Sequence, residues 1–88
     1  MKYRKRPIVI EAFPVEHFFD EKKFIPDWAE QAYREGVITR VASEDALHIQ
    51  TLEGVMRAGP NDYVIQGIKG ELYPCARDIF LATYETVE

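Results

Sequence analysis

Residues 7–13 alternate between the two faces of an extended chain. Ile8, Ile10 and Ala12 fall on one face, and the intervening valine, glutamate and phenylalanine fall on the other. This period of two and the β-branched side chains are typical of a strand. Pro14 follows directly, and a proline lacks the N–H that would continue a strand ladder. The pattern therefore predicts a strand over residues 7–13.

An irregular segment and one short helix follow this strand. Residues 15–26 hold three phenylalanines around a charged stretch, which predicts a loop with one helical turn. Asp27, followed three residues later by Glu30, resembles a capping box, and Gly36 is a natural end for a helix. The apolar stripe between them predicts a helix that must dock on the rest of the fold. The stripe consists of Trp28, Ala29, Ala32 and Tyr33.

Short alternating segments separated by glycine-containing turns fill most of the remaining chain. Glu53 with Gly54, and Lys69 with Gly70, are hairpin signals, because glycine supplies the positive φ that tight turns need. Hairpins join antiparallel strands. The predicted strands cover residues 37–42, 47–52, 55–58, 63–68 and 71–75.

The order of these elements predicts an α+β fold in a single domain over residues 1–88. We expect a small, bent antiparallel sheet of five to six short strands with one main helix packed on it. A partly open barrel is the neighbouring alternative. Residues 77–82 predict a second short helix or turn, and residues 84–87 a terminal strand or extended tail. A chain of this length leaves little interior for a buried active site, so function is expected at the surface or between subunits.

Charge is distributed unevenly along the chain. There are 11 Lys and Arg residues against 15 Asp and Glu, a net charge of −4. Lys2, Arg4, Lys5 and Arg6 lie within the first six positions, which leaves 7 basic against 15 acidic residues, or −8, for the remainder. A body of this charge repels a polyanion, so nucleic acid is not an expected partner.

The cysteine count and the hydropathy pattern indicate a compartment. A single cysteine cannot form an internal disulfide or supply a Cys-rich zinc site, which fits a reducing compartment. Glu11 interrupts the apolar stretch that follows the basic start, and no segment approaches the roughly 20 apolar residues of a membrane helix. We therefore expect a soluble cytoplasmic protein with no membrane partner.

Two stretches carry a resemblance to known proteins. They read MKYRKRPIVIEAF at residues 1–13 and TLEGVMRAGPNDYVIQGIKGELYPCARDIFLATYETV at residues 51–87. Together they resemble a family of small phage and prophage proteins of unassigned function, with a GDYVIxGIKGELYPCxxDIFxxTYE-like motif. Asn61 stands where the family has glycine, and Arg77 where it frequently has proline. The resemblance implies an accessory or host-interaction role in the cytoplasm of a bacterial host and brings no established chemistry.

Few side chains could support catalysis or metal binding. Cys75 is the only thiol, and His17 and His48 are the only imidazoles. Nucleophilic catalysis would need Cys75 beside an oriented base, and the two histidines match no metal-ligand spacing. We interpret Cys75 as a small apolar residue at a strand end and His48 as a surface residue. We therefore expect no catalytic residue, no metal and no cofactor, and we do not expect enzyme activity.

The last third of the chain offers the best candidate for a binding surface. Its glycine-containing turns could present backbone amides to an anion, and its aromatic side chains could stack on a ligand. We expect a non-catalytic binding or interaction module for a host or phage protein. The alternative is a protein or enzyme that binds or sequesters a nucleotide-like small molecule in a surface or inter-subunit pocket. The candidate binding residues are Asp62, Tyr63, Lys69, Glu71, Tyr73 and Arg77.

Residues 8–13 and 84–87 are expected at the edges of the sheet. Exposed edges pair with other chains, and a small core gains from burying further apolar surface in a symmetric dimer. The sequence therefore also predicts a homo-oligomer, most simply a homodimer.

Overall fold

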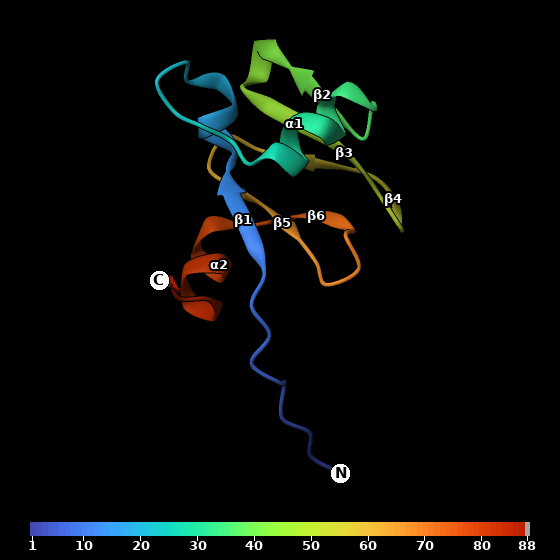
Figure 1. The fold of residues 1–88 in the computed structure, drawn as a ribbon, viewed down its shortest axis with the longest axis vertical. Coiled ribbons are helices and arrows are strands. Elements are labelled where there is room, and N and C mark those ends of the chain that lie inside the picture. Colours follow the sequence, from blue (N-terminus) through green and yellow to red (C-terminus); the bar gives the residue numbers. More distant parts are fainter. Residues whose placement is uncertain (88) are drawn as a thin grey trace.

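Two three-stranded antiparallel sheets and two α-helices make up residues 1–87, the part of the chain that the computed structural model describes (Figure 1). Two 3₁₀ helices, η1 and η2, connect some of these elements. In chain order the elements are β1 (Glu11–Pro14), η1 (Val15–Phe19), α1 (Asp27–Arg34), β2 (Ile38–Val41), η2 (Ala42–Glu44), β3 (Ala46–Thr51), β4 (Gly54–Ala58), β5 (Tyr63–Gln66), β6 (Leu72–Cys75) and α2 (Arg77–Thr83).

The first sheet has the order β1-β5-β6, so it joins the N-terminal strand to two strands from the last third of the chain. Phe13 lies opposite Val64, which in turn lies opposite Pro74. Phe13 and Val64 are buried in the main core, so this row faces the second sheet. Because side chains alternate along a strand, the next row lies on the opposite face. That row consists of Ala12, Ile65 and Tyr73.

The second sheet is a meander of order β2-β3-β4. Its β3–β4 hairpin turns at Leu52 and Glu53, one residue earlier than predicted, because Thr51 pairs with Gly54. The Thr51 hydroxyl donates a hydrogen bond of 2.7 Å to the Gly54 carbonyl oxygen. Gly54 has a φ of 105°, which confirms the need for glycine at this position.

The main core lies between the two sheets and is closed on one side by α1. Leu47 and Ile49 are fully buried on β3, and Ala29 and Ala32 bury the apolar stripe of the helix. The predicted capping box at Asp27 is wrong, because no side chain caps this helix. Pro26 occupies the N-cap position with an extended backbone, and Asp27 is the first helical residue. A carboxylate there stabilises the helix through its interaction with the positive end of the helix dipole.

Helix α2 covers the other face of the first sheet, which produces a second, smaller apolar layer. Ile65 is buried there although it is not part of the main core. Tyr63, also on this face, stacks on Phe80 of α2 with ring centroids 4.0 Å apart. The short helix predicted for residues 77–82 is therefore confirmed, whereas residues 84–87 form an extended tail with no strand.

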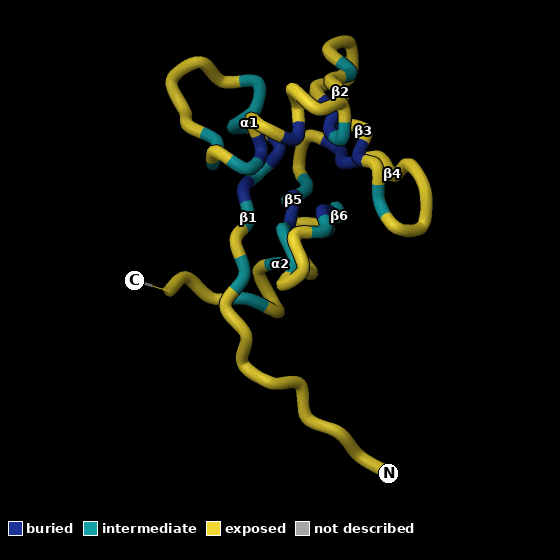
Figure 2. Tube along the Cα trace, turned by 45° about the vertical axis from the view of Figure 1, so that its right-hand side comes forward, coloured by how far each residue is buried: buried dark blue, intermediate teal, exposed yellow. Residues whose placement is uncertain are grey.

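The N-terminal ten residues form an extended arm outside both sheets. The arm leaves the lower end of β1 in Figure 1 and is exposed over residues 1–9 in Figure 2. The strand predicted for residues 7–13 begins only at Glu11, because its partner β5 ends opposite that residue, at Gln66.

The predicted α+β class with antiparallel pairing is confirmed. The strands divide into two small sheets that do not close into a barrel. Figure 1 shows the β2-β3-β4 sheet stacked above the β1-β5-β6 sheet, with α1 near the upper one and α2 below. No helix within residues 1–87 combines the length and the apolar character that a membrane crossing requires.

Candidate functional site

The six candidate residues belong to three different parts of the fold, and only Glu71 and Tyr73 line a common groove. Tyr63 and Tyr73 lie on the sheet face that α2 covers, where Arg77 begins the helix. Asp62 belongs to the turn between β4 and β5. The last two, Lys69 and Glu71, belong to the loop between β5 and β6.

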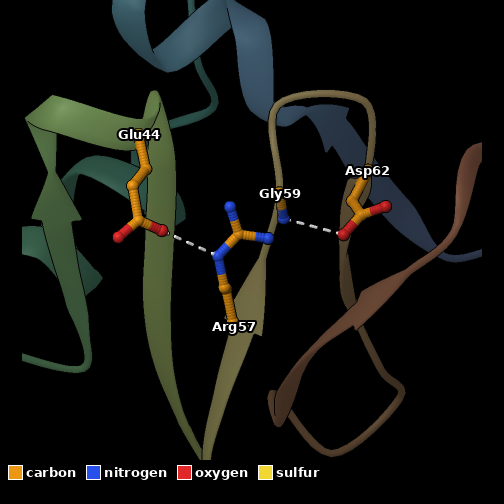
Figure 3. Close-up of polar contacts among 4 residues, drawn as sticks. All are labelled: Glu44, Arg57, Gly59 and Asp62. Carbon is orange, nitrogen blue, oxygen red and sulfur yellow. Dashed lines mark hydrogen bonds and ion pairs between the residues drawn. The ribbon is translucent and has the colours of Figure 1, made fainter.

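Asp62 braces the turn that precedes β5. Its Oδ2 accepts a hydrogen bond of 2.7 Å from the backbone N–H of Gly59, and this bond is partly buried (Figure 3). Its own carbonyl oxygen accepts a bond of 2.9 Å from the N–H of Val15. Asp62 therefore closes the β4–β5 turn and connects it to the start of η1. Its other carboxylate oxygen is not used in these contacts.

Arg57 connects this turn to the second sheet. Its Nε donates a hydrogen bond of 3.0 Å to Oε1 of Glu44, and Figure 3 shows the rest of the guanidinium directed toward Gly59. A Cβ at Gly59 would lie only 3.0 Å from Nη1 of Arg57 and 3.5 Å from Oδ2 of Asp62. A larger residue at this position would therefore displace the end of the Arg57 side chain, whereas its contact with Asp62 would be an ordinary van der Waals contact.

The aromatic residues of the last third stack on one another rather than forming a free platform. Phe80 lies between Tyr63 and Tyr84, with centroid distances of 4.0 Å and 5.0 Å. The ammonium of Lys5, from the arm, lies 5.6 Å from the centre of the Tyr84 ring. The arm is thus in contact with the end of the stack through a cation–π interaction.

Tyr73 has a strongly perturbed hydroxyl group. Burial is the largest cause, followed by the interaction with the Tyr84 side chain and the negative charge of Glu71, and together they raise the pKa of Tyr73 to about 12. A phenol with this pKa remains protonated at physiological pH and can donate a hydrogen bond. It is not a general base under those conditions.

The β5–β6 loop, predicted as a candidate anion site, is filled by its own glutamate. The Glu71 carboxylate accepts a bond of 3.3 Å from the backbone N–H of Lys69, and a side chain at Gly67 would collide with it. The loop closes through a bond of 2.8 Å from the Gly67 N–H to the Glu71 carbonyl oxygen. An external anion would therefore compete with a carboxylate that is already in place.

The groups considered for catalysis and metal binding are not brought together. Burial raises the pKa of the Cys75 thiol, and the negative charges of Asp62 and Asp78 raise it further, so the thiolate is disfavoured. His48 is exposed on the outer face of β3. No group of three or more histidine, cysteine, aspartate or glutamate side chains among residues 1–87 could hold a metal ion.

An open groove of about 320 Å³ lies between the β3–β4 hairpin and β6, and most of it was not predicted. Its lining comes from both sheets and from the turns that end their strands. Only Glu71 and Tyr73 of its lining were candidate residues. The signal that could have indicated it is the pair of large apolar residues, Leu52 and Met56, within a predicted hairpin; they are 91% and 40% exposed. The lining consists of Thr51, Leu52, Glu53, Met56, Glu71, Leu72, Tyr73 and Pro74.

Comparison with known proteins adds no relative to this description. No protein-family model, no curated protein sequence and no solved structure matches the chain. The resemblance to small phage proteins therefore stays a prediction, and the functional argument depends on the geometry of the chain itself.

Proposed function

We propose that the chain is a small non-catalytic interaction module, of phage origin, that acts on a host or phage protein in the bacterial cytoplasm. Its docking surface is the groove between the β3–β4 hairpin and β6. The occupant is a short extended segment of the partner, with aliphatic side chains flanked by Lys or Arg. The composition of the groove is the observation that carries this proposal.

The floor of the groove supports an aliphatic occupant. Met56 comes from the inner face of the second sheet, and Leu72 and Pro74 come from the inner face of the first. These side chains continue the main core outward, since Leu72 is only 7% exposed and belongs to it. An apolar side chain inserted here would extend the core, with a gain of roughly 25 cal/mol for each Å² of apolar surface buried.

The rim of the groove supports basic flanking residues. The two charged residues of its lining, Glu53 and Glu71, are both acidic. The body of the chain carries a net charge of −8 once the first six residues are set aside, so the wider field also attracts a cationic segment. Cations at the rim favour fast and specific association more than raw affinity.

The phage setting is supported by the resemblance of residues 1–13 and 51–87 to small phage proteins. The second of these stretches contains the whole lining of the groove. The raised pKa of the Cys75 thiol and the internal use of Asp62 and Glu71 also favour binding over catalysis.

A nucleotide-like ligand is less well supported as an occupant. A phosphate group would meet Glu53 and Glu71 at the rim of the groove. The loop amide of Lys69 already donates its hydrogen bond to the Glu71 carboxylate. Replacing an internal carboxylate by an external phosphate would give little net gain in free energy.

Titration of the ¹⁵N-labelled protein with a hexapeptide tests the proposal by NMR. The probe is Gly-Lys-Leu-Ile-Lys-Gly, and the control peptide carries glutamate in place of both lysines. We expect amide shifts at residues 51–56 and 71–74 with the basic peptide and much smaller shifts with the acidic one. Met56→Glu, which puts a charge on the floor, weakens binding by about tenfold or more.

Val55→Glu is the matched control for this variant. Val55 neighbours Met56 on the same strand but lies on the opposite face, where it is 58% exposed. The control adds the same charge and leaves the floor intact, so binding is retained. The proposal is wrong if the basic peptide produces no shifts at about 1 mM, or if the shifts lie outside the groove.

A further inference from the structure

Strand β1 presents an open edge whose backbone groups have no partner strand. It is the outermost strand of the β1-β5-β6 sheet. The Val15 N–H donates to the Asp62 carbonyl oxygen, and in an antiparallel pair alternate residues bond to the same neighbour. Phe13 and Glu11 therefore face β5, whereas Ala12 and Ile10 direct their N–H and C=O groups to the open edge. No turn or loop bond within residues 1–87 reaches these outward groups.

The strand-forming sequence continues past the end of the observed strand. Residues 7–10 are extended and β-branched in part, but β5 is too short to pair with them. Ile8 is 48% and Val9 71% exposed, so two neighbouring aliphatic side chains with strand preference lie uncovered beside the open edge. The strand preference of this segment is therefore not used by any pairing within residues 1–87.

We propose that this edge pairs with the same edge of a second copy of the chain, antiparallel about a two-fold axis at Ile10. Each copy supplies the partner strand that the open β1 edge of the other copy lacks. The two three-stranded sheets then form one six-stranded sheet of order β6-β5-β1-β1-β5-β6. This contact does not involve the β4–β6 groove and stands independently of the proposed function.

The register follows from the direction of the backbone groups. Outward-facing residues must meet each other, so even-numbered positions pair with even-numbered positions. An axis at Ile10 places Ile10 opposite its own copy and Ile8 opposite Ala12, which brings the apolar residues of the edge together. Pro14 and Pro7 lack an N–H and mark the two ends of the paired segment.

The faces of the joined sheet are also consistent with this register. A two-fold axis perpendicular to the sheet keeps equivalent faces on the same side. Because side chains alternate along a strand, Ile8 and Ile10 lie on the same face as Ala12. Helix α2 covers this face in each copy. Both copies of α2 therefore lie on the face that carries the exposed Ile8, and this helix itself has exposed apolar residues, Ile79 and Leu81.

Charge complementarity supports a second copy as the occupant. Beyond the paired segment, the basic arm of one copy runs toward the start of η1 in the other, where Glu16 is exposed. The arm holds Lys2, Arg4 and Arg6 in addition to Lys5, which lies over Tyr84 of its own chain, and the rest of each chain has a net charge of −8. The association is therefore expected to weaken as salt screens these charges.

Sedimentation velocity from low micromolar to about 0.5 mM protein tests the proposal. We expect the mass to rise from the 10.2 kDa of one chain toward twice that value. Ile10→Pro removes the central edge donor from both copies, so two hydrogen bonds are lost and the association weakens by about thirtyfold. Arg4→Glu combined with Arg6→Glu also weakens it.

Val9→Pro is the matched control, because the Val9 N–H does not face the open edge and the variant should dimerise like the parent. Thermal unfolding confirms that both proline variants keep the fold. A parent chain that remains monomeric at about 0.5 mM overturns the proposal, as do equal effects of the two prolines. A dimer that survives Ile10→Pro but is lost in Met56→Glu would place the contact in the groove and would also overturn the proposal.

Discussion

The two edges of the β1-β5-β6 sheet differ in how they can meet another molecule. At the β1 edge, Ile10 and Ala12 present backbone donors and acceptors, and the chain continues beyond them as an extended arm. At the β6 edge, the hydrogen bond between Gly67 and Glu71 shows which residues of β6 bond to β5, because alternate residues bond to the same neighbour. The backbone nitrogen of Pro74 is therefore on the side away from β5. The ring of Pro74 therefore stands where an outward N–H would be.

This difference shows that one small sheet can separate two kinds of recognition. The β1 edge suits a backbone ladder with a second strand, whereas the β6 edge is blunted by proline and borders a groove lined by side chains. Backbone pairing is tolerant of sequence, and side-chain pockets are selective. The proposed self-association and the proposed partner binding therefore use opposite edges and do not compete.

The largest expected effect comes from the central strand that supports both edges. Ile65 is 1% exposed and lies between Ala12 of β1 and Tyr73 of β6. Ile65→Ala should cost about 3 kcal/mol of unfolding free energy and weaken both edges together, as urea unfolding would show. A loss of less than about 1 kcal/mol would mean that the layer under α2 does not hold the sheet.

A smaller effect is expected from the helix that covers the sheet. Phe80→Ala removes the stack with Tyr63 and Tyr84 while leaving the main core intact. Because Phe80 is only half-buried, we expect a loss of about 2 kcal/mol. Leu81→Ala, on the same helix but 57% exposed, serves as the control and should change stability little. Equal losses would contradict the assignment of the stack as the support of α2.

Pro74→Val makes the two edges more alike. It gives β6 an outward N–H and keeps an apolar side chain in the groove, so an extended peptide there gains one hydrogen bond and binds about fivefold more tightly. Pro14→Val adds an outward N–H to β1 instead and should leave peptide binding unchanged. NMR titration with the basic hexapeptide compares the two variants, and a similar gain in both would show that the edges are not distinct.

The smallest expected effect is a dependence of stability on alkaline pH. The pKa of Tyr73 is about 12 in the folded chain against 10.0 for an ordinary tyrosine, so above pH 10 the unfolded chain releases this proton first. The contribution is fully present below pH 10 and is lost as the pH rises toward 12. Urea midpoints at about pH 9 and about pH 11 should fall less in Tyr73→Phe than in the parent. An identical fall in both would contradict this origin.

Local elements of the fold could be predicted because they depend on neighbouring residues. The helix from Asp27 follows from its alanine stripe, and the hairpins follow from Gly54 and Gly70, both of which have positive φ. The division of the strands into two sheets could not be predicted, since a period of two identifies a strand but not its partner. For the same reason the strand at residues 7–13 was predicted four residues too early at its start.

The candidate site shows the opposite limitation. Asp62, Tyr63 and Glu71 have the chemistry of ligand-binding residues, but the fold uses each of them in an internal contact. Those contacts join residues whose approach depends on the tertiary fold or on the loop conformation. The groove was missed because Met56 and Leu72 come from different sheets, and only the packing of one sheet on the other brings them together.

Amide hydrogen exchange at two protein concentrations tests most directly the claim that the two edges differ. The amides of Ile8, Ile10 and Ala12 should become protected as the concentration rises from low micromolar to about 0.5 mM, while the outward amide of Leu72 on β6 should not. The amide of Val9 serves as the internal control and should stay unprotected. Protection that rises at Leu72 instead, or at neither edge, would contradict the account.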